Sequence, residues 1–170
     1  MNRYCDVMLH GLLLAALALA LPVSPAAAQE QERGFSLDLF GASIRASGSN
    51  DANSRSLGLR GGYRFSRTWA LEGSLSRLDE DAQVWFGDLS AKAYFIHVSH
   101  FELYALGGPG RSGVSDGDGT DRATLHVGLG AEIGLGDRAY LRPEARRRWD
   151  AGQGDFGGVH EYSLGIGWKF

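Results

Sequence analysis

The sequence predicts an all-β protein, an eight-stranded antiparallel up-and-down transmembrane β-barrel preceded by a cleaved signal peptide. Three observations predict this class. The chain opens with an export signal over residues 1–28. It closes on residues 162–170, where apolar or aromatic side chains alternate with small or charged ones, as in a strand with two different faces. Between these ends, glycine-rich and polar clusters separate further segments with the same period of two.

Residues 1–28 have the composition of a secretory signal peptide. Arg3 supplies a positive charge, residues 11–21 form an unbroken apolar run, and three alanines at 26–28 provide a small-residue cleavage site. The apolar run is too short to cross a bilayer as a helix. We expect cleavage to leave 29–170 as a single barrel domain. Cleavage also removes Cys5, the only cysteine, which excludes disulfides and cysteine catalysis in the mature chain.

Eight segments of strand length follow the signal, and the connections between them alternate in length. Three connections are tight, and the other four are mostly longer and rich in Gly, Asp, Ser and Asn. Short turns on one rim and longer loops on the other are typical of outer-membrane barrels, whose termini lie on the short-turn side. The predicted strands are 34–46, 55–65, 69–78, 84–96, 101–110, 122–135, 139–149 and 159–170.

The first predicted strand fits the alternation least well. Phe35, Leu37 and Leu39 share one face, but Phe40 and the apolar residues after it blur the pattern, so we expect a bulge near Gly41. The next three strands alternate clearly, with leucine, alanine and aromatic side chains on the outward face. These outward residues are Leu57, Leu59, Tyr63, Phe65, Trp69, Leu71, Leu75, Leu89, Ala91, Ala93 and Phe95.

The remaining four strands continue the same apolar face. Large aromatics lie near both ends of the strands, with Phe65, Trp69 and Phe95 by the short turns and Trp85 and Trp149 by the long loops. Two aromatic girdles that flank an apolar band are typical of the two membrane interfaces. The outward residues of these strands are Phe101, Leu103, Ala105, Leu125, Val127, Leu129, Ala131, Ile133, Leu135, Leu141, Pro143, Ala145, Tyr162, Leu164, Ile166, Trp168 and Phe170.

The opposite face carries charges at membrane depth, and acidic and basic residues balance. An eight-stranded barrel is barely wide enough for its own side chains, so buried charges there must form pairs or bear a large desolvation cost. We therefore expect a closed, salt-bridged lumen. A soluble barrel, the alternative, would place its apolar face inside. The predicted ion-pair network comprises Arg60, Glu72, Lys92, Glu102, Glu132, Arg142, Glu144 and Arg146.

In these features the chain resembles the small outer-membrane barrels of the OmpA transmembrane-domain and OmpX type. The resemblance rests on the terminal strand ending Trp168-Lys169-Phe170, on the charged inward face of 140–146, and on the alternation of turns and loops. It implies export through the Sec pathway to the outer membrane of a Gram-negative bacterium. It also implies insertion by the barrel-assembly machinery, which would recognise Tyr162, Trp168 and Phe170. We expect a monomer.

The functional expectation is a structural or surface-interaction role: envelope integrity, lipopolysaccharide contact or binding through the loops. Arg55, Arg77 and Arg147 have lipid-face parity and lie toward the long-loop ends of their strands, as do Arg45 and Arg111. Arginine binds phosphate in a bidentate manner, and lipopolysaccharide presents phosphates at that height. The alternative is that these arginines are ordinary solubilising charges at strand ends.

Other classes of function find little support in the sequence. The whole chain carries a formal net charge of −3 without a long basic patch, which argues against nucleic-acid binding. Residues 116–121 place oxygens at alternate positions but lack the glycine and the distant glutamate of an EF-hand. We therefore predict no metal site and no cofactor. A small channel remains an alternative, although eight strands and a charge-matched lumen argue against diffusion of solutes.

The histidines argue against catalysis. We expect His97 and His100 in a short turn, on the wrong side for chemistry in the outer leaflet, and His126 inside the lumen. His160 lies on the face opposite both Glu161 and Ser163, so these three side chains cannot meet. The prediction is that the protein is not an enzyme. A lipid A-modifying enzyme, a known activity of some eight-stranded barrels, is the alternative.

Overall fold

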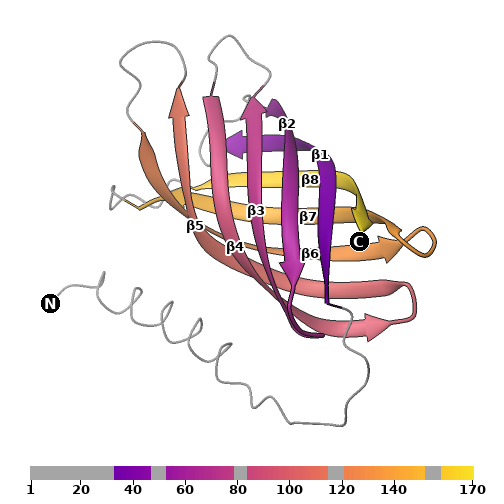
Figure 1. The fold of residues 1–170 in the computed structure, drawn as a ribbon. Coiled ribbons are helices and arrows are strands. Elements are labelled where there is room, and N and C mark those ends of the chain that lie inside the picture. Colours follow the sequence, from indigo (N-terminus) through magenta and orange to yellow (C-terminus); the bar gives the residue numbers. More distant parts are fainter. Residues whose placement is uncertain (1–32, 47–52, 79–83, 115–120, 152–157) are drawn as a thin grey trace, which may run out of the picture. The chain divides into compact units, whose positions relative to one another are not determined.

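The computed structural model describes residues 33–46, 53–78, 84–114, 121–151 and 158–170. Eight strands form a closed antiparallel barrel in which neighbours along the sequence are neighbours in the sheet (Figure 1). The predicted barrel is confirmed; residues 1–28 lie outside the described ranges. The strands are β1 Gly34–Ala46, β2 Asn53–Arg64, β3 Trp69–Leu78, β4 Val84–Val98, β5 Phe101–Val114, β6 Arg122–Gly134, β7 Ala139–Asp150 and β8 Val159–Lys169.

The barrel closes through pairing of the first and last strands. β1 and β8 pair antiparallel from Ser36↔Lys169 to Ala46↔Val159. The amide of Phe170 then donates a hydrogen bond of 2.9 Å to the carbonyl of Phe35, next to the start of β1. Every strand therefore has two partners, and no edge is left with unpaired backbone groups, which a strand needs in order to cross hydrocarbon. In the described part of the chain, no helix is long and apolar enough to span a membrane.

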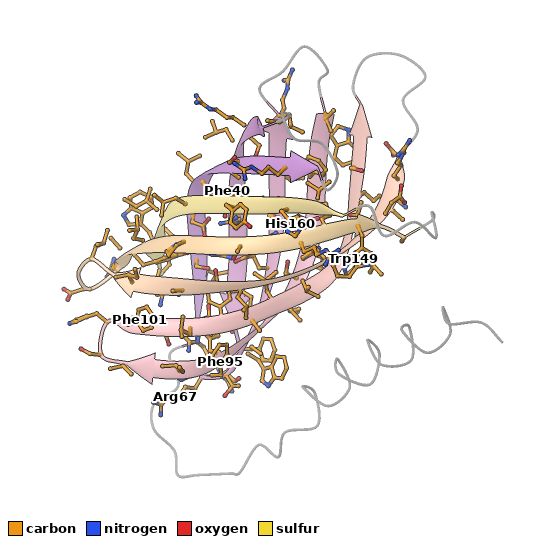
Figure 2. The ribbon with its side chains drawn as sticks, turned by 180° about the vertical axis from the view of Figure 1, so that it is seen from behind. Phe40, Arg67, Phe95, Phe101, Trp149 and His160 are labelled. Atoms are coloured by element: carbon orange, nitrogen blue, oxygen red, sulfur yellow. The ribbon has the colours of Figure 1, made fainter. Side chains whose placement is uncertain are left out.

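The outward face is apolar through the middle of the barrel and carries exposed arginines toward the long-loop ends. Leu59, Leu71 and Leu129 expose 54%, 51% and 61% of their surface, whereas most charged residues of the opposite parity are buried. Ala131 is an exception, because it has outward parity but is buried. Figure 2 shows Phe95 and Phe101 toward the short-turn end and Trp149 toward the opposite end. This distribution reverses that of a soluble protein and matches a barrel surrounded by lipid.

The predicted bulge near Gly41 is wrong. β1 keeps an unbroken register with β2 and with β8, so Phe40, Ala42 and Ile44 all point into the lumen and are buried. The lumen accepts the Phe40 ring because the guanidinium of Arg60 lies 3.6 Å above its centre. A cation over an aromatic face is stabilised without leaving the barrel interior.

An irregularity occurs instead near the end of β4. Tyr94 pairs with Tyr104, but Ile96 pairs with Leu103, so one extra residue, Phe95, is accommodated in β4. Phe95 and Ile96 are consequently both exposed, and the strand face is reversed beyond them.

This reversal changes the environment of His97, which we expected in a turn. β4 continues to Val98, and only Ser99 and His100 remain between β4 and β5. Ser99 has a φ of 46°, in the left-handed region that such a short connection requires. His97 therefore lies in the strand with its side chain turned toward the lumen mouth, and that part of the prediction is wrong. His100 lies in the turn and is exposed.

Candidate functional site

The centre of the lumen is organised around the guanidinium of Arg142 on β7. Its Nη1 donates to Asp38 Oδ2 at 2.7 Å and to Glu72 Oε2 at 2.5 Å, while Nη2 donates to Glu144 Oε2 at 2.6 Å. The Arg142 side chain is 0% exposed. Three carboxylates from β1, β3 and β7 therefore share one cation, which uses the forked donor geometry of arginine in a place that water does not reach.

Toward the long-loop end, the network continues through two more arginines of β7. Arg146 forms a short ion pair with Glu144 and a longer one, 3.3 Å, with Asp88 Oδ2. Arg148 contacts Asp88 Oδ2 at 2.9 Å and Glu161 Oε2 at 2.9 Å. Because alternate residues of a strand face the same side, Arg142, Glu144, Arg146 and Arg148 form one charged ladder along β7.

Toward the short-turn end, two lysines are among the cations of the network. The Nζ of Lys92 lies 2.8 Å from Glu132 Oε1, and the Nζ of Lys169 lies 3.0 Å from Glu132 Oε2. Lys169 also reaches Glu102, 3.1 Å away, which pairs with Arg64 at 2.8 Å. Lys169 is the penultimate residue of the chain, so this cluster connects the terminal strand to the lumen network.

The structure brings all eight residues of the predicted lumen network into ion pairs. Arg60, the remaining member, lies 3.3 Å from Glu144 Oε1 and donates to Ser163 Oγ at 2.8 Å. Its Nε and Nη1 have no hydrogen-bond partner in the described part of the chain. The pairs join strands on opposite sides of the barrel, so they fill the interior and leave little room for solvent.

Glycine–aromatic pairs, which sequence reasoning missed, complete the lumen. Tyr104 pairs across the sheet with Gly130, Tyr140 with Gly167, and Phe40 with Gly58. A Cβ at any of the three glycines would overlap the ring of its partner. The glycine leaves room for an inward aromatic ring on the adjacent strand, a cross-strand arrangement seen in other sheets. The signal was present as inward glycines, but their partners are defined only by the register.

A second missed arrangement lies beside the arginine ladder. Ser90 Oγ and His126 Nε2 are 2.8 Å apart, and His126 Nδ1 lies 3.7 Å from Asp88 Oδ1. A hydroxyl, an imidazole and a carboxylate in this order resemble a hydrolase triad. However, Ser90 and His126 are each 1% exposed, and the Nδ1–carboxylate distance exceeds that of a hydrogen bond. The described geometry therefore offers this serine no access to a substrate.

The predicted lipopolysaccharide contacts are exposed on the outer surface but do not form one cluster. Arg55 on β2 and Arg77 on β3 lie on neighbouring strands near their long-loop ends. Arg147, which pairs with Val127 and His160, lies on β7, halfway around the barrel from Arg77. His160 faces away from buried Glu161, as its parity predicts.

The residues predicted to direct assembly lie on the outer face of the terminal strand. Tyr162, Trp168 and Phe170 expose 58%, 45% and 73% of their surface. Within the described ranges, no group of three or more His, Cys, Asp or Glu residues is placed to hold a metal ion. Of the acidic segment 116–121, considered for calcium, residues 116–120 lie outside those ranges.

A closed barrel with an apolar exterior and an ion-paired interior defines a transmembrane barrel of the outer-membrane class. A family model for the outer membrane protein beta-barrel domain matches residues 13–170, and the chain belongs to this family. The match begins inside the segment predicted as the signal peptide. Membership places the protein among the outer-membrane barrels of Gram-negative bacteria. No curated protein matches the sequence.

Solved structures share the fold at low sequence identity. The N-terminal barrel of OprF from Pseudomonas aeruginosa superposes with a TM-score of 0.64 at 15% identity, covering 79% of this chain and 97% of that one. Ail, the attachment invasion locus protein of Yersinia pestis, gives 0.58 at 20% identity, covering 84% and 100%. The outer membrane enzyme PagL gives 0.50 at 12% identity, covering 76% and 97%. The fold therefore occurs in enzymes as well as in other outer-membrane proteins.

Proposed function

We propose that this protein is a structural component of the outer membrane, with a closed lumen, whose outer surface contacts lipopolysaccharide. The observation that carries the proposal is the buried ion-pair network, in which Arg142 joins Asp38, Glu72 and Glu144 across the barrel. A lumen filled with ion-paired side chains favours a structural role for the barrel over a role as a channel. Binding through the long loops, most of whose residues lie outside the described ranges, is the other part of the proposal.

The packing of the lumen argues against the channel alternative. A cavity of about 290 Å³ opens at the short-turn end and is lined by Arg64, Lys92 and Glu132, among others. Arg142 and Tyr104 do not line it, and both are fully buried. Ion pairs of this kind must separate before a hydrated ion can pass, which is costly in a low-dielectric interior.

Lipopolysaccharide contact is assigned to Arg55, Arg77 and Arg147. All three are exposed, and no described side chain forms an ion pair with any of them. An arginine facing lipid costs only about 0–1 kcal/mol near the interface, so these positions tolerate a charge that can bind phosphate. The test is lipopolysaccharide retention after Arg55, Arg77 and Arg147 are replaced by Gln. We expect retention to fall, and undiminished binding would refute the arginine contacts.

The route to the membrane follows from the two ends of the chain. Residues 1–28 are assigned as a signal peptide for the Sec pathway, and Tyr162, Trp168 and Phe170 as the signal for the barrel-assembly machinery. A monomeric barrel is proposed because closure leaves no strand edge for a partner. Fractionation tests the route: a band in the outer membrane whose mobility changes on boiling supports it, and a periplasmic product contradicts it.

The second candidate is a lipid A-modifying enzyme, favoured by the Ser90–His126–Asp88 arrangement alone. Its burial supports a structural role for these residues. Mass spectrometry of lipid A from cells with and without the protein distinguishes the two. A mass change that disappears in the Ser90→Ala variant would establish the enzyme, and we expect no change.

A further inference from the structure

The outer surface of the barrel carries a groove in its lipid-facing wall. The groove is shallow and open to its surroundings, with a volume of about 660 Å³. Its sides are formed by Leu37, Leu59, Leu75 and Leu89 from β1 to β4, which are neighbouring strands (Figure 1). Trp85 and Arg111 lie at its long-loop end.

Glycines form the floor of the groove. Gly61 on β2 pairs with Gly73 on β3, and Gly87 on β4 pairs with Arg111 on β5. The three glycines thus step across the sheet from the middle of the barrel toward the long-loop end. With no side chains there, the leucines on either side stand above a trough that runs to Arg111.

These floor glycines differ from the glycines of the lumen. A Cβ at Gly61 would meet nothing within 4 Å, and one at Gly73 would meet only the Asp88 carbonyl oxygen, at 4.0 Å. Neither residue has a positive φ. No described contact therefore requires glycine at either position, although glycine weakens a strand interior. A strand-interior glycine without a packing partner is one kind of place where another molecule can approach the backbone closely.

The composition of the groove specifies the molecule. Its floor and sides are apolar and lie in the hydrocarbon region, so the bound portion must be a hydrocarbon chain. At the long-loop end, the exposed Arg111 side chain forms no ion pair with any described residue. Its fork favours a phosphate, and the indole of Trp85 beside it suits the membrane interface.

We propose that this groove binds one lipid A moiety of lipopolysaccharide, with an acyl chain over Gly61 and Gly73 and a phosphate at Arg111. The inference rests on the proposed function for the presence of lipopolysaccharide around the barrel, but it uses none of the three arginines assigned there. The groove would be a defined lipopolysaccharide site on one side of the barrel, in addition to the separate arginine contacts.

The test uses full-length protein extracted from outer membranes in mild detergent, with bound lipopolysaccharide counted by native mass spectrometry. Gly73→Leu fills the groove, and we expect it to remove the one lipopolysaccharide molecule that the groove holds, while any molecules bound through Arg55, Arg77 and Arg147 remain. Gly41→Leu is the matched control, because Gly41 is an outward glycine off the groove whose Cβ would find its nearest atom, the Ser56 carbonyl oxygen, at 3.9 Å. We expect this control to retain lipopolysaccharide at the wild-type level.

The head-group contact is tested separately with purified lipid A added back to the delipidated barrel. Arg111→Gln should weaken the binding of intact lipid A about tenfold. Lipid A without phosphates should bind the wild-type protein about as weakly as intact lipid A binds this variant. Equal binding of stripped and intact lipid A overturns the proposal, as does wild-type retention by Gly73→Leu or equal loss by Gly41→Leu. If the Arg55, Arg77 and Arg147 substitutions leave bound lipopolysaccharide unchanged while Gly73→Leu lowers it, the proposed arginine contacts are refuted and the groove site is supported.

Discussion

The phenol ring of Tyr104 on β5 occupies the space above Gly130, its cross-strand partner on β6. The Tyr104 hydroxyl donates to Glu144 Oε2 at 2.5 Å and accepts from Arg142 Nε at 2.6 Å. The glycine thus gives the ring a position from which it binds both members of the central ion pair. Gly130 on β6 thus makes room for the ring whose hydroxyl binds Arg142 and Glu144 of β7.

We predict that Gly130→Ala destabilises the barrel by about 1–3 kcal/mol, because the added methyl displaces a ring held by two buried hydrogen bonds. Urea unfolding of the barrel in lipid vesicles, followed by the boiled-versus-unboiled gel shift, measures the change. Gly41→Ala, whose added methyl points outward and meets only the Ser56 carbonyl oxygen, at 3.9 Å, is the control and should change stability little. Equal effects of the two substitutions would contradict the role assigned to the glycine.

Replacing Arg142 by Met should lower the free energy of unfolding by more, about 3–5 kcal/mol, since it removes the buried cation that Asp38, Glu72 and Glu144 share. The same unfolding assay applies. Arg122→Gln, which removes an exposed pair with Asp150, serves as the control and should cost at most about 1 kcal/mol. Adding Glu72→Gln to Arg142→Met should restore part of the loss. A double variant whose loss equals the sum of the two single losses would show that the pair is not coupled.

The closed lumen predicts that the purified protein forms no stable open channel in planar bilayers. Ion pairs at Lys92, Arg142 and Arg148 occupy successive depths of the interior, so current should remain at baseline apart from brief events. A steady conductance that persists after repurification would contradict the closed lumen and favour the channel alternative.

Phe170→Ala should slow assembly while leaving the folded barrel almost as stable as the wild type. The Phe170 side chain is 73% exposed, and its backbone amide, which bonds to Phe35, is retained in the variant. The yield of heat-modifiable protein in outer membranes measures assembly, and urea unfolding measures stability. Phe95→Ala is the matched control, because Phe95 is an outward aromatic near the same rim at 56% exposure. Similar yields from both variants would argue against a terminal assembly signal.

Ser90→Ala should cost about 1–3 kcal/mol of stability, because it leaves the buried Nε2 of His126 without a partner. Lipid A composition in cells that express the variant should match that in cells with the wild type. Preserved stability together with a changed lipid A profile would reverse this assignment and identify Ser90 as a nucleophile.

The sequence predicts strand positions well because the signal is local. β1 and β3 have the boundaries that the alternation predicts, and most other ends differ by one to four residues. Burial of one face and exposure of the other follow directly from the period of two. The prediction failed where a neighbour compensates for a locally unfavourable choice: Phe40 points inward because Arg60 covers its ring, so no bulge is needed at Gly41.

The irregularity at Phe95 and the inward side chain of His97 could not be predicted, because an extra residue in one strand is defined only relative to its partner. The groove is likewise a property of the register, which aligns Gly61 with Gly73 and places Arg111 at the end of the trough. Ser90 and His126 are far apart in sequence and meet only because the barrel is narrow.

The sequence by itself determined the class of the protein, the number of strands, and which face of each strand is apolar and which is charged. These properties depend on side chains two residues apart. The tertiary structure alone decided which charges pair, which aromatic covers which glycine, and where the outer wall is hollowed. Arg142 and Asp38 are separated by 104 positions along the chain yet lie 2.7 Å apart. The reason is physical: closure of the sheet brings distant strands face to face across an interior only a few side chains wide.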